Sequence, residues 1–428
     1  MAFSKQTIQD IDLKGKKVLL RADYNVPVKD GKITADFRVE QSVQTVRYLL
    51  DKGAAVVICS HLGRPKGEVE DKYSLKPVQK HLSKLLDTNV AFAEDCIGDQ
   101  AEQAASKLAP KEVLLLENLR FHPEEEQNDA EFAKKLVRLA DIFVQDGFGV
   151  VHRAHASTDA ITKYLPSVAG LLLEQEVSTI TEAMNNPKRP LMAIVGGAKI
   201  ADKIDVLKRF IDIADFVVVG GAMANTFLLA KGIDVAKSKV DREDVSLARD
   251  IMQKAANKAK KQPFIFYTPQ DGVVANKLDK TAGTRIVDWD AHVIADIESY
   301  PKTPPKSKLQ IHENEMVLDI GPVSGAFIAG GIQLAGTVIW NGAMGVTELE
   351  GLQGPIGPFA HGTEIIVDAM LGAHGNRPFT LVGGGDTVGY IESRELTESF
   401  DHVSTGGGAG LDLMSGKKLP GVEALLDK

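Results

Sequence analysis

The sequence predicts an α/β protein with two domains, each built on a parallel sheet flanked by helices. Three observations lead to this prediction. Short aliphatic runs alternate with amphipathic stretches along nearly the whole chain, as they do in βαβ units. The length of 428 residues exceeds what one ordinary hydrophobic core supports. A single helical stretch interrupts the alternation near residue 170.

The strands and helices of the first half can be placed in order. Compact runs of β-branched and aliphatic residues are typical of buried parallel strands, because both faces of such strands are covered. We expect these strands at residues 17–21, 55–59, 113–116 and 142–144, and helices at residues 38–52, 75–86 and 129–139.

The same rhythm resumes in the second half. Strands are expected at residues 191–195, 216–219, 264–267, 338–340, 379–382 and 402–404. Residues 300–307 contain three prolines and two lysines, which indicates a surface loop.

The domain boundary is expected at residues 170–186, which read GLLLEQEVSTITEAMNN. This stretch is typical of one helix, and Pro187 and Pro190 end it. We therefore predict two Rossmann-like domains, residues 1–169 and 187–404, joined by an interdomain helix. A helix inside one large domain remains the alternative on periodicity alone.

Composition excludes several classes of protein. A net charge of -8 argues against general nucleic-acid binding, which needs a basic surface. The two cysteines, Cys59 and Cys96, cannot supply a disulfide framework and are expected to be reduced and buried. No apolar run approaches the roughly 18 residues of a membrane span, and the first residues do not resemble a signal peptide. We expect a cytoplasmic protein.

Basic side chains gather after the predicted strands of the first half. Functional groups of parallel sheets collect at the carboxyl ends of strands, and arginine donates two parallel hydrogen bonds to phosphate or carboxylate. One arginine alone is more simply a surface ion pair, but the set predicts a cradle for a small polyanion. Its members are Asp23, Asn25, His61, Arg64, Arg120, His122, His152, Arg153 and His155, joined by Arg38 if the preceding residues fold back.

Glycines dominate the strand ends of the second half. They let the backbone approach a phosphate, whose oxygens then meet the free N–H groups of a helix N-terminus. Asp386 is placed to hold a magnesium ion between two phosphates. We expect Lys199 and Lys203, four residues apart, on one face of a helical start. The set comprises Gly196, Gly197, Lys199, Lys203, Gly220, Gly221, Asn341, Gly342, Gly384, Gly385, Asp386, Thr387, Gly407 and Gly408.

Two other functions are compatible with these residues. No GxxxxGK[ST] and no complete G-x-G-x-x-G occurs, since Val388 and Leu411 stand where third glycines belong. A dehydrogenase that binds NAD on the glycine-rich half is the main alternative, and a non-catalytic anion-binding module is the second. A metal site at His152 and His155 is disfavoured because no carboxylate or cysteine accompanies them at suitable spacing.

Eight strings give the chain a resemblance to the phosphoglycerate kinase family that runs nearly end to end. They are LLRADYNVP, SHLGRPKG, LLLENLRFHPEEE, HRAHAS, VGGAKIADKI, WNGAMGV, LVGGGDT and HVSTGGGAGLDLMSGKKLPGVEAL. The resemblance implies a monomeric enzyme that interconverts 1,3-bisphosphoglycerate plus ADP with 3-phosphoglycerate plus ATP, using Mg²⁺ and no nucleic acid or membrane. It also implies two domains that close on a cleft by hinge bending, and a segment 405–428 that returns to the first domain.

The resemblance further implies a role for each matching residue. The 3-phosphoglycerate site comprises Asp23, Asn25, Arg38, His61, Arg64, Arg120 and Arg153. The nucleotide site comprises Lys203, Glu348 and Gly384 to Thr387, with Asp386 on the metal. Lys199, Gly407 and Gly408 steady the phosphoryl group in flight.

The implied chemistry is direct in-line transfer without a covalent intermediate. We expect Arg38 from the first half to meet the phosphoryl group together with Lys199, Lys203 and the amides of Gly407 and Gly408 from the second. The sequence departs from the family pattern at Val317, Ala343, Thr347 and Gly410, and the first three are expected to bear on nucleotide affinity.

Overall fold

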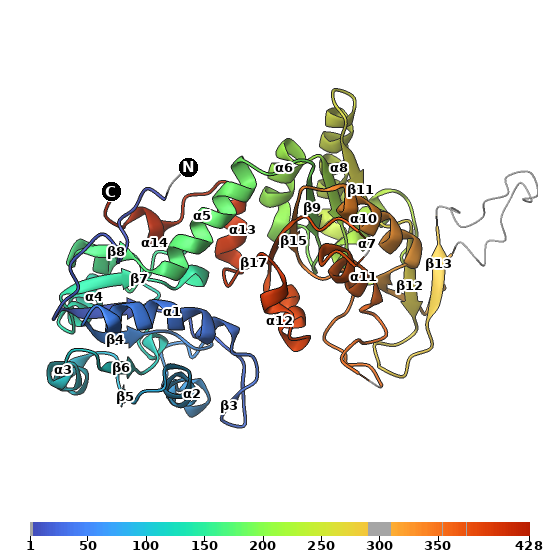
Figure 1. Ribbon diagram of the computed structural model, residues 1–428. Helices are drawn as coiled ribbons and strands as arrows, with labels where there is room; N and C mark the ends of the chain where they lie inside the picture. The colour runs from blue at the N-terminus through green and yellow to red at the C-terminus, as the bar shows by residue number, and fades with distance from the viewer. Residues whose placement is uncertain (1–2, 290–309, 353, 374) are drawn as a thin grey trace, which may run out of the picture. The chain divides into compact units, whose positions relative to one another are not determined.

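The computed structural model describes residues 3–289, 310–352, 354–373 and 375–428 (Figure 1). The loop predicted at residues 300–307 lies outside these ranges. Two compact units are present: Met1–Thr181 with Thr405–Lys428, and Glu182–Ser404. They are called unit 1 and unit 2 below.

Unit 1 is built on a six-stranded sheet in which every strand pair is parallel. The four strands predicted in this half are confirmed as β1 (Lys17–Arg21), β4 (Ala55–Cys59), β6 (Val113–Leu116) and β7 (Ile142–Gln145). The prediction missed β5 (Val90–Ala93) and β8 (Ser167–Ala169), the two edge strands, because alanine and serine make up half or more of each and mark a strand only weakly. The order is β5-β6-β4-β1-β7-β8.

Helices cover both faces of this sheet. Val18 and Leu20 of β1 pack into one core with residues of α1 (Phe37–Asp51) and α2 (Lys76–Leu86). Leu19 points to the opposite face, where residues of α3 (Gly98–Lys107) and α4 (Ala130–Val137) form a second core. Side chains on both faces of the sheet are therefore buried, which explains why its central strands are rich in consecutive aliphatic residues.

The two ends of the chain meet in unit 1, as Figure 1 shows. The amide of Gln6 donates to the carbonyl of Leu426, and the Lys5 ammonium lies 2.8 Å from the Asp427 carboxylate. The closing segment adds α13 (Gly408–Met414) and α14 (Pro420–Glu423), and the amide of Gly421 donates to the carbonyl of Val151. A short hairpin of β2 (Val28–Lys29) and β3 (Lys32–Ile33) precedes α1.

Unit 2 contains a second all-parallel six-stranded sheet, in the order β11-β10-β9-β15-β16-β17. Its strands, all predicted, are β9 (Leu191–Val195), β10 (Phe216–Val219), β11 (Ile265–Tyr267), β15 (Thr337–Asn341), β16 (Phe379–Gly383) and β17 (His402–Val403). Its helices are α6 (Ile204–Ile213), α7 (Gly221–Ala230), α8 (Val245–Ala259), α10 (Pro322–Leu334), α11 (His361–Met370) and α12 (Gly385–Ser393). The predicted fold class is confirmed by these two sheets.

A three-stranded antiparallel sheet in unit 2 was not predicted. It consists of β12 (Asp271–Ala275), β13 (Arg285–Asp288) and β14 (Met316–Ile320), in the order β13-β12-β14. These strands are short, and β14 lies 41 residues after β12 along the chain, so no local pattern reveals their pairing.

One helix, α5 (Leu171–Asn185), occupies the stretch where the interdomain helix was expected. Its first amides, from Leu172 and Leu173, donate to the buried Asp146 carboxylate at 3.0 and 3.2 Å.

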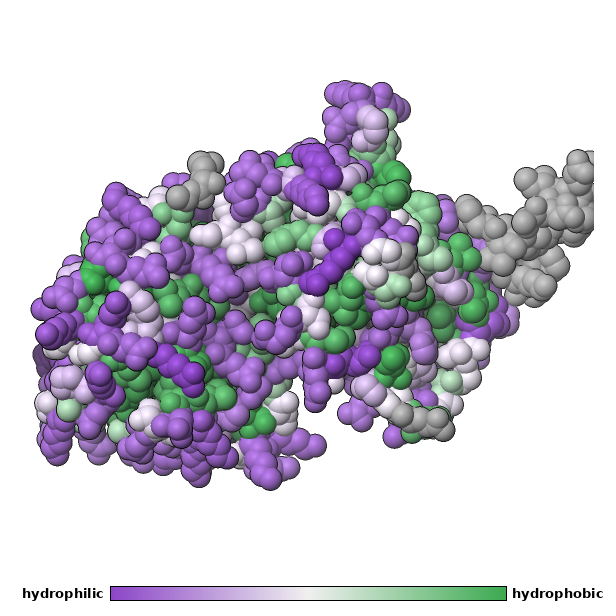
Figure 2. All heavy atoms as spheres, in the orientation of Figure 1, coloured by the Kyte–Doolittle hydropathy of each residue, from purple (hydrophilic) through white to green (hydrophobic). Residues whose placement is uncertain are grey.

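The surface of unit 1 is mainly hydrophilic on the face that Figure 2 shows, with apolar residues between the hydrophilic ones. Among the described residues, no helix is long and apolar enough to span a membrane.

Candidate functional site

A buried carboxylate organises the polar groups at the carboxyl end of the unit 1 sheet. Asp23 follows β1, and its oxygens lie 3.6 Å from Nη1 of Arg38 and 3.9 Å from Nδ1 of His61. The amide of Asn25 donates to the same carboxylate at 3.1 Å. Burial alone would raise the pKa of Asp23, but the charges of Arg38 and Arg21 and the hydrogen bond from the Asn25 amide hold it below its usual value. Asp23 is therefore the anion that orders this cationic group.

Loops that follow three different strands are tied together beside Asp23. The side-chain oxygen of Asn25 accepts from the amide of Gly63 at 2.9 Å, and Nη1 of Arg120 donates to the carbonyl of Gly63 at 2.9 Å. Gly63 has a φ of +64°, and a Cβ there would lie 2.3 Å from the Tyr73 ring. Only glycine fits this junction, so the loop after β4 is fixed between those after β1 and β6.

Two of the predicted arginines differ from the rest. Arg64 and Arg153 are exposed, whereas Arg120 is only 6% exposed. Within the described ranges Arg64 has no hydrogen bond or ion pair, and Arg153 donates to the His152 ring at 3.2 Å. Guanidinium groups that are not committed to protein carboxylates keep their donors for an incoming anion.

Sequence reasoning missed Arg21 and Glu125 as supporting residues. Arg21 is 1% exposed, and its Nε donates to Oγ of Ser157 at 2.7 Å while Nη2 lies 3.4 Å from Nδ1 of His61. Glu125 is fully buried, accepts 2.6 Å from Ser157 and lies 3.9 Å from Arg21. The signal for Arg21 was an arginine that ends a strand with an aliphatic middle, KVLLR.

The glycines after β17 lie in unit 1, not with the glycine-rich sheet. The mechanism expected the amides of Gly407 and Gly408 to come from the second half, and that assignment is wrong. Thr405–Lys428 belongs to unit 1, where the family resemblance implies that segment 405–428 lies. A Cβ at Gly407, whose φ is +48°, would lie 3.9 Å from Nη2 of Arg38, and one at Gly408 would lie 3.3 Å from the His152 ring. The amide and hydroxyl of Thr405 both donate to Glu176 of α5, at 2.6 and 2.8 Å, which anchors the segment.

His155 gives this region a measurable pH dependence. Burial, followed by Arg21, Arg120 and Arg153, lowers its pKa from 6.5 to about 4. Between these values the unfolded chain binds more protons, so stability rises with pH across this window and falls as pH drops. We expect His155→Asn to reduce the loss of unfolding free energy between pH 7 and 5 by about 1 to 2 kcal/mol.

Urea unfolding at both pH values measures this effect. His81 of α2, which is partly exposed and whose Nε2 lies 2.7 Å from Asp36, gives the matched control His81→Asn. An unchanged pH dependence in His155→Asn would contradict the assignment.

In unit 2 the ammonium of Lys203 is enclosed by oxygen atoms. Its Nζ donates to the carbonyl of Gly196 at 2.6 Å and to the side-chain and main-chain oxygens of Asn341 at 2.7 and 3.0 Å. Burial lowers the pKa of Lys203 to about 8, against the opposing effect of Asp386 and Asp202. Lys203 thus joins the loops after β9 and β15.

Glycines allow the strand-end loops of unit 2 to meet backbone to backbone. A Cβ on Gly196 would lie 2.1 Å from the carbonyl oxygen of Ala343, and one on Gly221 would lie 2.6 Å from the amide of Gly197. At the next strand, Gly384 has a φ of +93° and precedes α12. The buried hydroxyl of Thr387 accepts from the amide of Gly342 at 2.7 Å, which ties α12 to the same loops.

The predicted pairing of Lys199 with Lys203 on one helix face is wrong. Lys199 precedes the helical residues, and Lys203 lies in the short 3-10 turn Ala201–Lys203 at the start of α6. Gly197 has a φ of +122°, which takes the chain away from helical geometry. Lys199 is consequently exposed while the Lys203 ammonium is enclosed.

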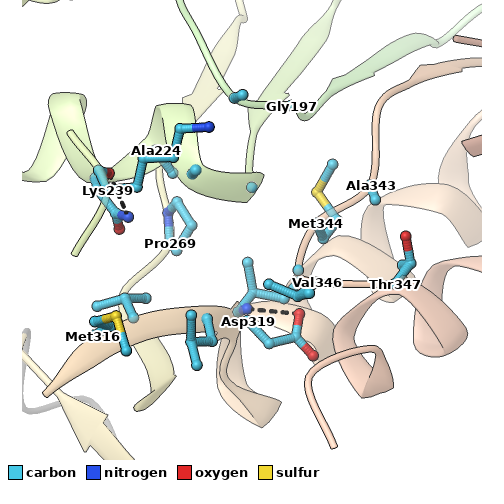
Figure 3. A pocket seen from close by; sticks show the side chains of 18 of the residues that line it. Gly197, Ala224, Lys239, Pro269, Met316, Asp319, Ala343, Met344, Val346 and Thr347 are labelled. Atoms are coloured by element: carbon cyan, nitrogen blue, oxygen red, sulfur yellow. Dashed lines mark hydrogen bonds between the residues drawn. The ribbon is translucent and has the colours of Figure 1, made fainter. Parts of the chain in front are cut away.

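A cavity of about 480 Å³ lies beside these loops in unit 2. Figure 3 shows Ala343, Met344 and Thr347 on one side of it and Met316 and Lys239 on the other. Gly221, Glu348 and Asp386 also line it, whereas Lys199, Lys203, Gly220, Asn341, Gly384, Gly385 and Thr387 do not. The three departures from the family pattern, Val317, Ala343 and Thr347, all contribute to its wall.

Asp319 is a cavity residue that sequence reasoning did not find. It is 2% exposed at the end of β14, and the amides of Ile320 and Gly362 donate to its carboxylate at 2.8 Å each. Burial raises its pKa to about 8. Figure 3 shows its side chain among those of the cavity wall. Its strand belongs to the unpredicted antiparallel sheet, so no local signal marked it.

The chain is similar to known proteins over nearly its whole length. The sequence model described as phosphoglycerate kinase matches residues 8–417. A phosphoglycerate kinase of Moorella thermoacetica is 44% identical over 426 residues, covering 100% of both chains, and one of Chloroflexus aggregans is 45% identical over 99% of this chain and 100% of its own. The solved structures of phosphoglycerate kinases from Coxiella burnetii and Pyrococcus horikoshii align with TM-scores of 0.78 and 0.79, at 35% and 30% identity, each covering 98% of both chains.

Proposed function

The chain belongs to the phosphoglycerate kinase family, and from that premise we propose how its residues carry out the reaction. It is an ATP-dependent kinase of glycolysis that transfers a phosphoryl group to the carboxyl group of 3-phosphoglycerate. This membership replaces the alternatives of a dehydrogenase and of a non-catalytic binding module.

The phosphoglycerate is assigned to unit 1. Its phosphate and carboxylate need several fixed cations, and Arg38, Arg64, Arg120 and Arg153 provide planar forks at the strand ends. Asp23 and Asn25 hold the loops in place, and the side-chain NH₂ of Asn25 is left to donate to a substrate hydroxyl. His61 is 3% exposed, and its pKa is lowered well below 6.5 by burial, so it acts as a neutral hydrogen-bond partner.

The nucleotide is assigned to unit 2. The cavity of about 480 Å³ accepts the base and sugar, and Glu348 on its wall is placed to hydrogen-bond a ribose hydroxyl. The N-terminus of α12, with Gly384, Gly385 and Thr387, faces the phosphates, and Gly220 and Gly221 allow them to approach the loop after β10.

Magnesium accompanies the nucleotide in this family. Asp386 fits it, because its carboxylate is exposed in the first turn of α12, lines the cavity and receives no hydrogen bond from the described residues. When bound, the ion neutralises charge on the nucleotide phosphates. Lys203, with a pKa of about 8 without nucleotide, is held in its ammonium form by the nearby phosphates.

Catalysis then consists of positioning and charge neutralisation. A carboxylate oxygen of 3-phosphoglycerate attacks the γ-phosphorus as the bond to the β–γ bridging oxygen breaks, and neither oxygen needs a general base. Arg38 and the amides of Gly407 and Gly408 in unit 1, with Lys199 and Lys203 in unit 2, meet the charge that spreads over the equatorial oxygens. Direct transfer requires the two units to close on the substrates in each turnover, which excludes water.

The observation that carries this proposal is the division of donors. Arg38 lies beside Gly407 in one unit, and Lys203 lies among the strand-end loops of the other. Stereochemistry at phosphorus tests it, using ATP made chiral at the γ-position with isotopic oxygens. Direct in-line transfer inverts the configuration, whereas retention would require a phosphorylated side chain and would overturn the proposal.

Asp386→Ala is expected to raise the Mg²⁺ concentration needed for half-maximal activity by about 10-fold or more, because the ion loses its protein carboxylate. Initial rates over a Mg²⁺ titration at fixed ATP measure this shift. Glu398→Ala, at an exposed acidic residue in the same part of unit 2, is the control. If the titration midpoints of Asp386→Ala and the parent coincide, the metal lies elsewhere.

We also propose that the enzyme works as a monomer in the cytoplasm, without nucleic-acid or membrane partners. Its net charge of -8 supports the absence of nucleic-acid partners, and its two free, buried cysteines support a reducing compartment.

A further inference from the structure

Three potential metal ligands lie together in unit 1, apart from the groups described above. They are Asp95 and Cys96, which follow β5, and His122, which follows the 3-10 turn Leu119–Phe121 after β6. Their ligand atoms all lie within 4.8 Å of one another. The reaction assigned to this enzyme uses none of the three, so the cluster needs an explanation of its own.

The two loops hold these side chains in a defined arrangement. Oδ1 of Asp95 lies 2.7 Å from Nε2 of His122 and accepts from the amide of Cys96 at 2.6 Å. Its second oxygen, Oδ2, has no hydrogen bond to any part of the chain that the structure describes. Asp95 therefore has one oxygen that orients its carboxylate and another with free lone pairs.

Exposure gives the cluster an open side and a closed side. The side chains of Asp95 and His122 are 43% and 26% exposed, whereas Cys96 is 1% exposed. An ion arriving from solvent would meet the carboxylate and imidazole first and then the thiol below them. The ring of His122 also packs against Phe132, with centroids 5.5 Å apart, which limits its movement.

We propose that Asp95, Cys96 and His122 bind a zinc-type divalent cation. One sulfur, one nitrogen and one oxygen ligand form a set that Zn²⁺ accepts in tetrahedral geometry, while Mg²⁺ and Ca²⁺ prefer oxygen alone. Three protein ligands leave the fourth position to water, as in an open zinc site.

Binding rearranges the protons of the cluster without any redox change. The Cys96 thiol loses its proton to solvent and coordinates as the thiolate. His122 coordinates through Nε2, so its remaining proton resides on Nδ1, and its contact with Asp95 is replaced by the shared ion. The ligand atoms have to draw together by about 1 Å to reach metal–ligand distances of about 2.0 to 2.3 Å. They are carried by loops, not by strands, which permits that movement.

Cobalt provides a direct test, because Co²⁺ adopts the zinc geometry and is coloured. The reduced, chelator-treated full-length protein is titrated with Co²⁺ while excess Mg²⁺ is present to occupy all-oxygen sites. We expect one equivalent to bind, with a near-ultraviolet thiolate-to-cobalt band, visible bands of a tetrahedral ion, and loss of both on adding Zn²⁺. Absence of stoichiometric uptake, or uptake without the thiolate band, would overturn the proposal.

Matched variants identify the ligands. Cys96→Ala should abolish the thiolate band, and His122→Gln should weaken Co²⁺ binding by more than about 100-fold, since loss of an outer-shell partner alone costs about 10- to 100-fold. Cys59→Ala removes the other buried cysteine and should leave band and affinity unchanged. If Cys96→Ala fails to fold, His122→Gln still decides, because binding within threefold of the parent would exclude the site.

Discussion

Replacement of Arg38 by alanine is expected to lower kcat by about 10³-fold or more, with a much smaller change in KM. Arg38 is the arginine closest to Gly407, its Nη2 lying 3.9 Å from the position of a Cβ there. A cation that meets charge appearing only in the transition state affects the chemical step more than substrate binding.

The surroundings of Arg38 explain why its position is defined before substrate arrives. Its Nη1 donates to the carbonyl of Asn25 at 3.0 Å and lies 3.6 Å from Asp23, while the side chain remains 27% exposed. The guanidinium is therefore anchored on one side and accessible on the other. Arg38→Lys keeps the charge but loses the planar fork, so its kcat should lie between those of the parent and Arg38→Ala.

Arg47 supplies the control, because it is an exposed arginine on the same helix and donates to the carbonyl of Leu85 instead. Arg47→Ala should keep the kcat of the parent. Steady-state kinetics with 3-phosphoglycerate and ATP, coupled to NADH consumption, measures all three variants. A change confined to KM in Arg38→Ala would assign this residue to ground-state binding only.

Replacement of Lys203 by methionine is expected to lower kcat by about 10² to 10³-fold, the usual effect of removing one fixed donor from a site of developing charge. The methionine preserves the apolar stem but removes the ammonium that joins Gly196 to Asn341. Because Lys203 donates to Oδ1 of Asn341, the variant leaves this oxygen without that hydrogen bond. The Nδ2 atom of Asn341 already lacks a partner among the described residues. The loop after β15 should then lose its alignment.

Two further variants separate the effect of the lost charge on kcat from an effect on folding. Lys208→Met, at an exposed lysine on the same helix α6, should leave both kcat and the melting temperature unchanged. Lys203→Arg restores a cation and should recover part of the activity if charge is what the site needs. Turnover of Lys203→Met within threefold of the parent would remove this residue from the catalytic group.

Much of the fold could be predicted because most of its strands have a recognisable local sequence pattern. A strand buried on both faces, such as β9, is apolar over most or all of its length, and the ten predicted strands were placed within about two residues of their ends. The edge strands β5 and β8 were missed because alanine and serine make up half or more of each. The antiparallel strands β12 to β14 were missed because each has only two or three consecutive apolar residues and contains an aspartate.

In the candidate site, too, some residues could be predicted from local pattern and others could not. The chemistry of Arg120, Lys203 and Asp386 could be read from residue type and from their place after strands, because parallel strands present their carboxyl ends at one edge. The role of Arg38, which lies in α1, came from the family resemblance. Supporting residues such as Arg21 could not, since a strand position alone does not show which polar group lies opposite.

By itself, therefore, the sequence determined the fold class, the family and the kinds of group that each half presents to its substrates. Those properties depend on local pattern and on motifs. Only the tertiary structure decided that Gly407 lies close to the Arg38 guanidinium, that Lys203 is enclosed while Lys199 is exposed, and that Asp319 enters the cavity wall. The basic half and the glycine-rich half do not coincide with the two units for a physical reason. The closing segment is held by hydrogen bonds to residues hundreds of positions away, such as that from Thr405 to Glu176. The family motifs imply that this segment returns to the first domain, but local pattern does not specify which contacts hold it there.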